Sequence, residues 1–304
     1  MEVEQQKKTE LEEEKGTYLY PEWGEDINNY RTNWSRIREQ NLEGVPLSFY
    51  QETVEKHSGL LKRIRREFQM LRPEGLTRLK RQYDGDEIDL DAAVEYFIDR
   101  KIGLSPSEKN YMLTEKRERD IAVVFLIDMS RSTKGSTIQC EKESLVIMSE
   151  ALSEVGDAFG IYGFSGDNRD NVDFYRIKGF EESYNQKVKT RISAIEDGCE
   201  NRDGAAIRHT VNLLRKRDEK TKIIILLSDG KPVDKEYSGT YAIEDTRMAL
   251  KEAQRYGIKT FCITVDRTAA EYLPRMYSHS SWVVIDDVVK LPEKITRIYR
   301  MLTE

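Results

Sequence analysis

The pattern of apolar and polar positions changes after Arg119, and this change divides the chain. Beyond it, apolar runs of strand length alternate with segments of helical periodicity. The strongest runs are IAVVFLID (121–128) and KIIILLSDG (222–230), which are typical of strands covered by helices on both faces. Further strands are predicted at 160–164, 172–178, 258–265 and 281–286, and helices at 137–155, 185–195, 204–217, 242–256 and through Tyr299. Such alternation predicts a doubly wound α/β fold with a mainly parallel sheet.

The first part of the chain has a different character. Residues 1–17 are almost entirely charged or amide-bearing, so we expect a disordered leader. Aromatic residues stand among charges from Tyr18 to Leu42, and we expect this segment to pack onto the domain beneath it. Apolar residues recur every three to four positions over 48–72, which predicts a helix.

A second helix is predicted within 84-DGDEIDLDAAVEYFIDRKIG-103, with Asp89 as its N-cap. The alternating carboxylates also resemble a calcium loop, but that pattern requires glycine at loop position 6, where this chain has Asp89. We therefore favour the helix start. Together these patterns predict a helical N-terminal extension over 18–115, followed by the α/β domain over 116–304.

Composition narrows the possible functions. Of 304 residues, 34% are charged and 38% are hydrophobic, and the net charge is −6, which argues against nucleic acid as the main partner. Three cysteines without metal-ligand spacing indicate reduced thiols in an intracellular protein. No apolar run is long enough to span a bilayer and the N-terminus is not signal-like, so we expect a cytoplasmic protein.

Candidate chemistry lies where the two strongest strands end. In 126-LIDMSRSTKG-135, a buried strand leads to Asp128, Ser130 and Ser132 at alternate positions, and SDG with Asp229 follows the other strand. Helix capping would explain one of these oxygens, whereas a hard divalent cation would explain all of them. Ligands of parallel sheets bind outside the carboxyl ends of strands. The sequence therefore predicts a Mg²⁺ site whose ligands leave room for a carboxylate from outside.

DMSRS at 128–132 resembles the DxSxS motif of von Willebrand factor A (vWA) domains, and 226-LLSDGKP-232 resembles the distal aspartate motif of that family. The resemblance covers about 116–304 and implies a Rossmann-like vWA fold with a metal ion-dependent adhesion site. It implies that Asp128, Ser130 and Ser132 hold the ion and that Asp229 acts through a water molecule.

The middle motif of the family departs from its pattern. In 199-CENRDGAAIRHT-210, Asn201 stands where the family places a threonine, and either Asn201 or Asp203 could supply an oxygen. A direct Asp203 ligand would add negative charge and make the site less dependent on a partner's carboxylate. The implied metal set is Asp128, Ser130, Ser132, Asn201, Asp203 and Asp229, with Mg²⁺ as the ion and Mn²⁺ or Ca²⁺ as substitutes.

A narrower resemblance rests on YPEWGED (20–26), RDIAVVFLIDMSRST (119–133) and NRDGAAIRH (201–209), together with 71–103. These stretches are similar to the C-terminal part of NorD-like and CbbO-like activation proteins. The resemblance implies a protein-binding adaptor or activator that works with a MoxR-type AAA+ ATPase on a client metalloenzyme such as nitric oxide reductase or rubisco. An acidic residue of the partner would complete the metal site.

Enzymatic alternatives find less support. The chain has no GxxxxGK[ST] phosphate loop, Ser130 replaces the second aspartate of a haloacid dehalogenase motif, and GFSGD (163–167) is not a nucleophile elbow. A metal-assisted hydrolase with Asp203 as general base stays open, as does an ion that only rigidifies the loops. We also expect Asp128, as a surface residue at a strand end, to contribute little to the core.

Overall fold

The computed structural model describes residues 16–70, 76–116, 120–228, 230–264, 268–277, 282–285 and 290–303. Most of the predicted leader, 1–17, lies outside these ranges. The described residues form two compact units. One unit combines the residues up to Phe68 with those from Asp120 onward, and the other is Gln69–Arg119.

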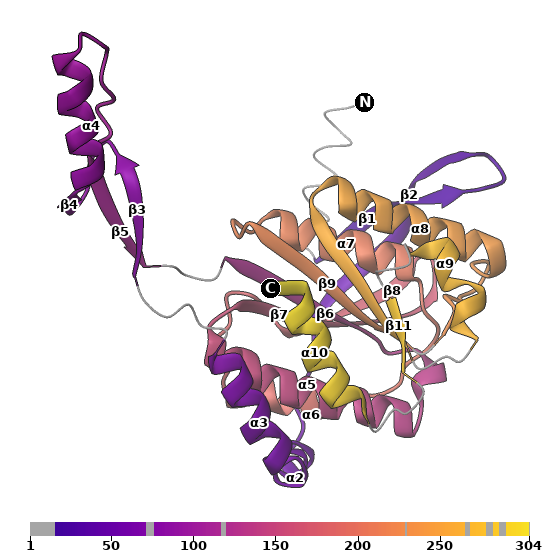
Figure 1. The fold of residues 1–304 in the computed structure, drawn as a ribbon. Coiled ribbons are helices and arrows are strands. Elements are labelled where there is room, and N and C mark those ends of the chain that lie inside the picture. Colours follow the sequence, from indigo (N-terminus) through magenta and orange to yellow (C-terminus); the bar gives the residue numbers. More distant parts are fainter. Residues whose placement is uncertain are drawn as a thin grey trace. The chain divides into compact units, whose positions relative to one another are not determined.

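The larger unit contains a sheet and its covering helices (Figure 1). Its strands are β1 (Thr17–Gly24), β2 (Asn29–Asn41), β6 (Ile121–Asp128), β7 (Ala158–Asn168), β8 (Asn171–Lys178), β9 (Thr221–Ser228), β10 (Ile258–Thr264) and β11 (Trp282–Val284). Its helices are α2 (Ser48–Lys56), α3 (Ser58–Gln69), α5 (Ser136–Val155), α6 (Gln186–Ser193), α7 (Asp203–Arg215), α8 (Gly239–Arg255), α9 (Leu273–Met276) and α10 (Leu291–Thr303), with the short 3-10 turns η1 (Arg131–Thr133) and η2 (Ala269–Glu271).

The strands form one eight-stranded sheet in the order β1-β2-β8-β7-β6-β9-β10-β11. From β7 to β11 the neighbouring strands are parallel, whereas β8 runs antiparallel to β7. This confirms the predicted α/β fold with a mainly parallel sheet. Strand β6 lies at its centre between β7 and β9, which places its carboxyl end where parallel sheets bind ligands.

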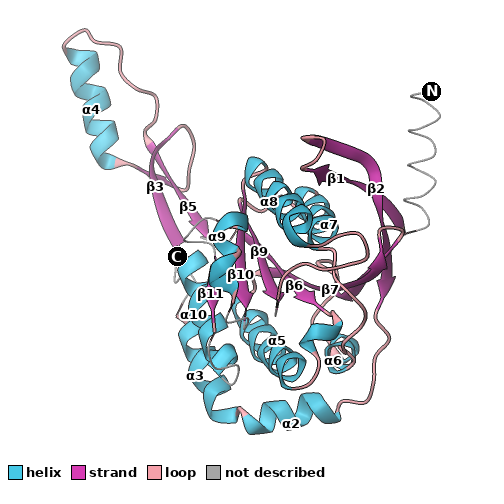
Figure 2. Ribbon diagram, turned by 90° about the vertical axis from the view of Figure 1, so that its right-hand side faces the viewer, coloured by secondary structure: helices cyan, strands magenta, loops and turns pink. Residues whose placement is uncertain are grey.

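Helices cover both faces of the sheet, as Figure 2 shows. α7 and α8 lie on one face, and α5, α6 and α10 lie on the other. All eight residues of β6 are buried between these layers, which explains its uninterrupted apolar sequence. The helix predicted at 48–72 is divided into α2 and α3 at His57, where Ser58 and Gly59, both weak helix formers, follow.

The helical extension that we predicted over 18–115 is wrong for its first segment. β1 and β2 form an antiparallel hairpin, and β2 extends the large sheet by pairing in parallel with β8. The strand signal is visible in SRIR, because Ser35 and Ile37 are buried whereas Arg36 and Arg38 are exposed. The aromatic residues among charges concealed this two-residue alternation.

The hairpin packs onto α7, which confirms that its aromatic residues anchor it to the α/β domain. Rings of Tyr18 and Tyr20 contact the fully buried imidazole of His209 on α7, with centroids 4.6 and 5.7 Å away. The Tyr20 hydroxyl lies 2.9 Å from His209 Nδ1, and Glu39 of β2 lies 3.4 Å from Nε2. Burial lowers the pKa of His209, although the Glu39 carboxylate opposes this shift.

Attachment of the hairpin should therefore weaken in acid. A histidine with a lowered pKa binds fewer protons folded than unfolded, so its contribution to stability is lost as pH falls through the unfolded value, about 6.5. Thermal unfolding followed from pH 7.5 to 5 should show a steeper decline for wild type than for His209→Gln. The control Asn212→Gln, about one turn further along α7, changes no titratable group and leaves His209 in place, so it should follow wild type. Equal slopes for wild type and His209→Gln would contradict the prediction.

The smaller unit also differs from a purely helical extension. It contains an antiparallel sheet in the order β3-β5-β4, formed by β3 (Leu76–Gln82), β4 (Glu87–Ile88) and β5 (Tyr111–Lys116), and the helix α4 (Leu90–Lys101). Asp89 caps α4, as predicted, by accepting a hydrogen bond from the amide of Ala92. Asp86 accepts from the amide of Thr114, so these carboxylates serve backbone amides, which supports the helix start over a calcium loop.

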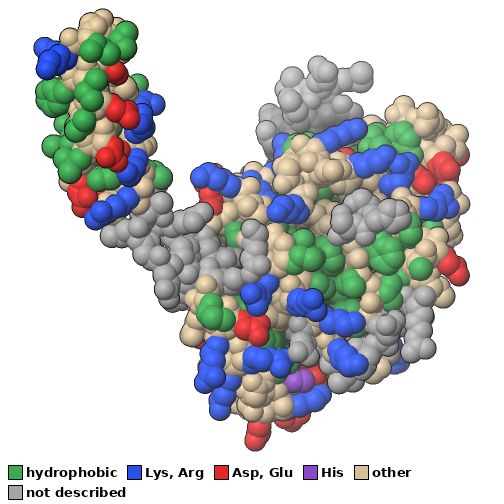
Figure 3. All heavy atoms as spheres, viewed as in Figure 1, with side chains coloured by type: hydrophobic (Ala, Val, Ile, Leu, Met, Phe, Trp, Pro, Cys, Tyr) green, Lys and Arg blue, Asp and Glu red, His purple; other side chains and the backbone are tan. Residues whose placement is uncertain are grey.

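Helix α4 carries an apolar stripe that is open to solvent, and Figure 3 shows hydrophobic side chains gathered on this unit. More than half of each side chain in the stripe is exposed: Leu90, Val94, Phe97, Ile98 and Ile102. These positions recur on one face of a helix. The unit thus buries little of its own apolar surface. In the described ranges, no helix combines the length and apolar character needed to cross a membrane.

Candidate metal site at the carboxyl end of β6

The end of β6 places a carboxylate beside two hydroxyls. Asp128, the last residue of the strand, is fully buried, and its Oδ1 accepts a hydrogen bond of 2.9 Å from the amide of Ser130. This tight turn directs the chain into η1 and brings the hydroxyl oxygens of Ser130 and Ser132 within 2.9 Å of each other. The three residues predicted from DxSxS therefore lie together.

Asn201 holds Asp128 from the loop before α7. Its Nδ2 donates to Asp128 Oδ2 at 2.6 Å, and its Oδ1 accepts from the amide of Val233 at 2.7 Å. If the side-chain amide of Asn201 were flipped, its oxygen would face the Asp128 carboxylate and its NH₂ group would face the Val233 N–H. The two hydrogen bonds therefore determine the amide orientation. In this arrangement the Asn201 oxygen serves Val233, and its nitrogen orients Asp128.

Asp203 occupies a different environment. It is the first residue of α7 and is only 1% exposed. Its charge acts on Tyr277, the buried residue that follows α9: burial, then Cys262, then Asp203 raise the pKa of Tyr277 well above its usual value. Asp203 is not among the residues that line the cavity at the site. Asp229 lies outside the described residues.

Two contributors were missed by the sequence analysis. Ser228, the last residue of β9, donates its hydroxyl to Asp128 Oδ2 at 3.1 Å. It could have been found from the neighbouring strand ends, because Ile127 is opposite Leu227 in the sheet. Thr268, before η2, lines the cavity, and no sequence motif pointed to it.

A cavity of about 260 Å³ opens above these groups. Its lining comprises Ser130, Arg131, Ser132, Glu200, Asn201, Gly230, Lys231, Val233 and Thr268. A groove of about 840 Å³ beside β10 is larger but contains none of the predicted ligands. We therefore assign the site by its chemistry and not by its size.

The donor set fits a hard cation. Asp128 and the two serine hydroxyls offer oxygen ligands, which Mg²⁺ and Ca²⁺ prefer. The buried Asp128 carboxylate accepts hydrogen bonds from Ser130, Asn201 and Ser228. These three donors are neutral, so they do not compensate its negative charge. Within the described part of the chain, no group of three or more His, Cys, Asp or Glu side chains could hold a metal, so an ion here would depend on hydroxyl ligands.

Asp128 itself corrects one expectation. We predicted a surface residue that contributes little to the core, but the side chain is fully buried and accepts three hydrogen bonds. The reason is the length of the neighbouring strand: β7 continues beyond Phe164, the partner of Asp128, as far as Asn168. The end of β6 is therefore enclosed by its neighbours.

Comparison with known proteins agrees with this architecture. The family model of the von Willebrand factor type A domain matches residues 122–294. Protein NorD of Brucella melitensis is 33% identical over 292 residues, which are 93% of this chain and 45% of that protein. Protein NorD of Stutzerimonas stutzeri is 37% identical over 237 residues, 76% of this chain and 39% of that protein. The chain thus spans less than half the length of these curated relatives.

Among solved structures, the pilus adhesin SpaC from Lactobacillus rhamnosus GG in its open conformation has a similar fold, with a TM-score of 0.50 and 12% identity. The match covers 62% of this chain and 30% of the adhesin. The match of the family model extends from β6 into α10 and includes the strand ends that carry the candidate metal ligands. The chain belongs to the von Willebrand factor type A domain family.

Proposed function

We propose that this chain is a metal-dependent protein-binding module that acts as an accessory protein or activator in the cytoplasm and is not itself an enzyme. The observation that carries the proposal is that Asp128, Ser130 and Ser132 lie together, with both serines lining a cavity open to solvent. These residues would hold Mg²⁺, or Mn²⁺ or Ca²⁺ in its place. Asp229 would contribute through water, and Asn201 or Asp203 would complete the set.

The ion, when bound, supplies a positive charge that an acidic side chain of the partner can approach. Arg131 and Lys231 line the same cavity and outnumber its one carboxylate, Glu200, which favours an acidic partner residue further. Ser132 is exposed, so the site can be reached from outside. The contact would give orientation and specificity to an interface whose remaining area lies elsewhere.

For the partner we propose a MoxR-type AAA+ ATPase, with a client metalloenzyme such as nitric oxide reductase or rubisco. The support is the similarity to proteins named NorD over most of this chain and the resemblance to activation proteins of the NorD and CbbO kind. A hydrolase that uses the same ion, with Asp203 as its base, stays the alternative; Asp203 is as buried as Asp128 and, like it, does not line the cavity.

Capture of a MoxR-type AAA+ ATPase from the same organism should require both the ion and its ligands. With purified proteins, Mg²⁺ should support capture and EDTA should abolish it. Ser132→Ala should weaken capture at least about ten-fold while retaining the fold, because the hydroxyl is exposed and acts on the metal. Asp170→Ala, which removes an exposed carboxylate in the turn between β7 and β8, is the matched control and should bind like wild type.

Two results would contradict the proposal in different ways. Capture that survives EDTA and Ser132→Ala would assign the ion a structural role. Mg²⁺ binding without capture of the ATPase under any condition would show that the site serves another partner.

A further inference from the structure

A buried arginine joins the metal site to the N-terminal hairpin. Arg202 directly follows Asn201 and is only 2% exposed. Its Nη1 donates to both carboxylate oxygens of Glu22 in β1, at 2.7 and 2.9 Å. Its Nε donates to Asp234 Oδ2 at 2.8 Å, and its Nη2 donates to the carbonyl of Lys235 at 2.9 Å. One side chain therefore binds the hairpin and the loop after β9.

The loop that Arg202 holds also forms a wall of the metal site. Val233 lines the cavity and forms two hydrogen bonds with Asn201. The backbone amide of Asn201 donates to the Val233 carbonyl at 3.0 Å, and the backbone amide of Val233 donates to the side-chain Oδ1 of Asn201. Asn201 in turn donates to Asp128. The orientation of the metal-binding carboxylate thus depends on a loop that is fixed by Arg202 from one side and by Asn201 from the other.

Charge makes this connection dependent on the hairpin. Glu22 is fully buried, and it also accepts hydrogen bonds from Ser35 of β2 and, at 2.6 Å, from the hydroxyl of Tyr241 in α8. Burial opposes the charge of Arg202, but the carboxylates of Glu22 and Asp234 raise its pKa above the usual value. Removing Glu22 would leave Nη1 of the buried Arg202 guanidinium without its acceptor. A buried charged group in that situation moves toward another acceptor.

We propose that Arg202 is a positioning residue through which docking of the β1–β2 hairpin sets the metal affinity of the site at Asp128. The inference rests on the proposed function, because it requires that the site bind a metal ion. The hairpin would regulate the metal site from outside the vWA strands. Any partner that displaces the hairpin would weaken metal binding at Asp128, because the hydrogen bonds of Arg202 and Asn201 connect the two.

The first test is the affinity of the full chain for Mg²⁺, measured by isothermal titration calorimetry. Glu22→Gln preserves the shape of the side chain and removes its charge, so Arg202 loses one of its two carboxylates. We expect the dissociation constant for Mg²⁺ to rise about ten-fold, as is typical when residues that support metal ligands are changed.

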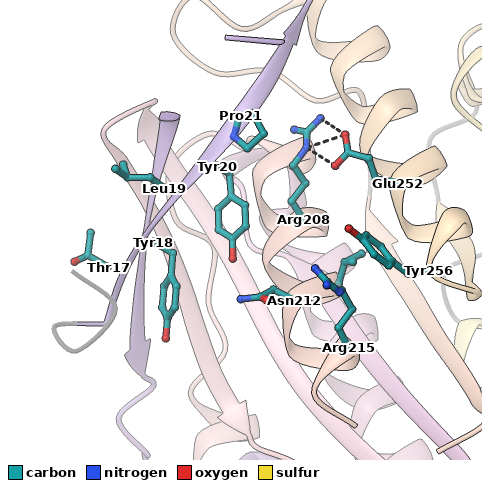
Figure 4. A pocket seen from close by; sticks show the side chains of 11 residues that line it. Thr17, Tyr18, Leu19, Tyr20, Pro21, Arg208, Asn212, Arg215, Glu252 and Tyr256 are labelled. Atoms are coloured by element: carbon teal, nitrogen blue, oxygen red, sulfur yellow. Dashed lines mark hydrogen bonds and ion pairs between the residues drawn. The ribbon is translucent and has the colours of Figure 1, made fainter. Parts of the chain in front are cut away.

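The chain offers a matched control away from the hairpin. Arg191 of α6 is buried, and its Nη1 donates to both carboxylate oxygens of Glu182, at 3.0 and 2.7 Å. Glu182→Gln should lower stability through the same kind of ion pair and leave the Mg²⁺ affinity unchanged. The pair of Arg208 and Glu252 beside β1, which Figure 4 shows, is not a suitable control, because Glu252 also accepts from Tyr30 of the hairpin at 2.8 Å.

The second test uses the reciprocity of coupled sites. If the hairpin sets metal affinity, Mg²⁺ must stabilise the docked hairpin by the same factor. Hydrogen exchange of the β1 and β2 amides in wild type should slow when Mg²⁺ is added. Arg202→Lys retains the charge but cannot bridge two carboxylates and a carbonyl in one plane, so this protection should be lost even where the variant is fully folded.

The outcomes separate the two proposals. A wild-type chain that binds no Mg²⁺ would remove the proposed metal site, and this inference with it. Wild-type binding with unchanged affinity in both Glu22→Gln and Arg202→Lys would overturn only the inference. An equal loss of affinity in Glu182→Gln would also overturn it, because general destabilisation would then be sufficient.

Discussion

Asp128→Ala should abolish Mg²⁺ binding and, with it, the stabilisation that Mg²⁺ gives to the folded chain. The substitution removes the central carboxylate of the site, which accepts from Ser130, Asn201 and Ser228. At a free concentration of 100 times its dissociation constant, a ligand that binds only the folded state raises the free energy of unfolding by about 2.7 kcal/mol. Wild type should show this increase, and the variant should show none.

Urea unfolding with Mg²⁺ and with EDTA provides the measurement. The difference between the two conditions is the relevant quantity, because removal of a buried charge and loss of its hydrogen bonds act in opposite directions on the metal-free protein. Asp120→Ala, just before the opposite end of β6, is the control and should retain the full difference. A variant that is still stabilised by Mg²⁺ would show that the ion binds elsewhere.

Gly204→Ala should destabilise the chain by about 3–5 kcal/mol, the range for breaking a buried ion pair. A Cβ at this position would overlap the carboxylate of Asp245. Asp245 is fully buried and cannot move without cost, because it pairs with Arg208, accepts from the Tyr237 hydroxyl and accepts from the amide of Trp23 in the hairpin. The glycine of DGAAIRH is thus required by a neighbouring carboxylate.

Equilibrium unfolding of Gly204→Ala should be compared with that of Gly59→Ala. Gly59 lies in α3, and a Cβ there would meet no atom within 4 Å. Alanine is the better helix former, so this control should be neutral or slightly stabilising. If Gly204→Ala unfolds at the same urea concentration as wild type, then Asp245 is less constrained than its hydrogen bonds indicate.

A structural role can be predicted from the sequence when it depends on neighbouring residues of the chain. IAVVFLID predicts β6 with its bounds, because complete burial leaves a continuous apolar run. Likewise, the spacing of Asp128, Ser130 and Ser132 is sufficient to predict that they meet, because one turn brings them together.

Roles that depend on distant partners were not predictable in this way. Nothing near Glu22 indicates that it will be buried against Arg202, and without that partner the hairpin resembles a solvated, aromatic-rich segment. The orientation of Asn201 depends on Val233, which lies in a different loop. Sequence reasoning could identify Asn201 as a residue of the site but could not decide which of its atoms faces Asp128.

The pairing of Glu22 with Arg202 also has a consequence for synthesis of the chain. The two residues are 180 positions apart, and a ribosome that adds about 5–20 residues per second needs roughly 9–36 s to make that length. Throughout this interval the hairpin has been made, but α7 and α8, the helices that pack against it, have not. The nascent chain therefore carries Glu22 without its buried partner until Arg202 has been made, so β1 can complete its contacts only after the long segment between the two residues has been synthesised.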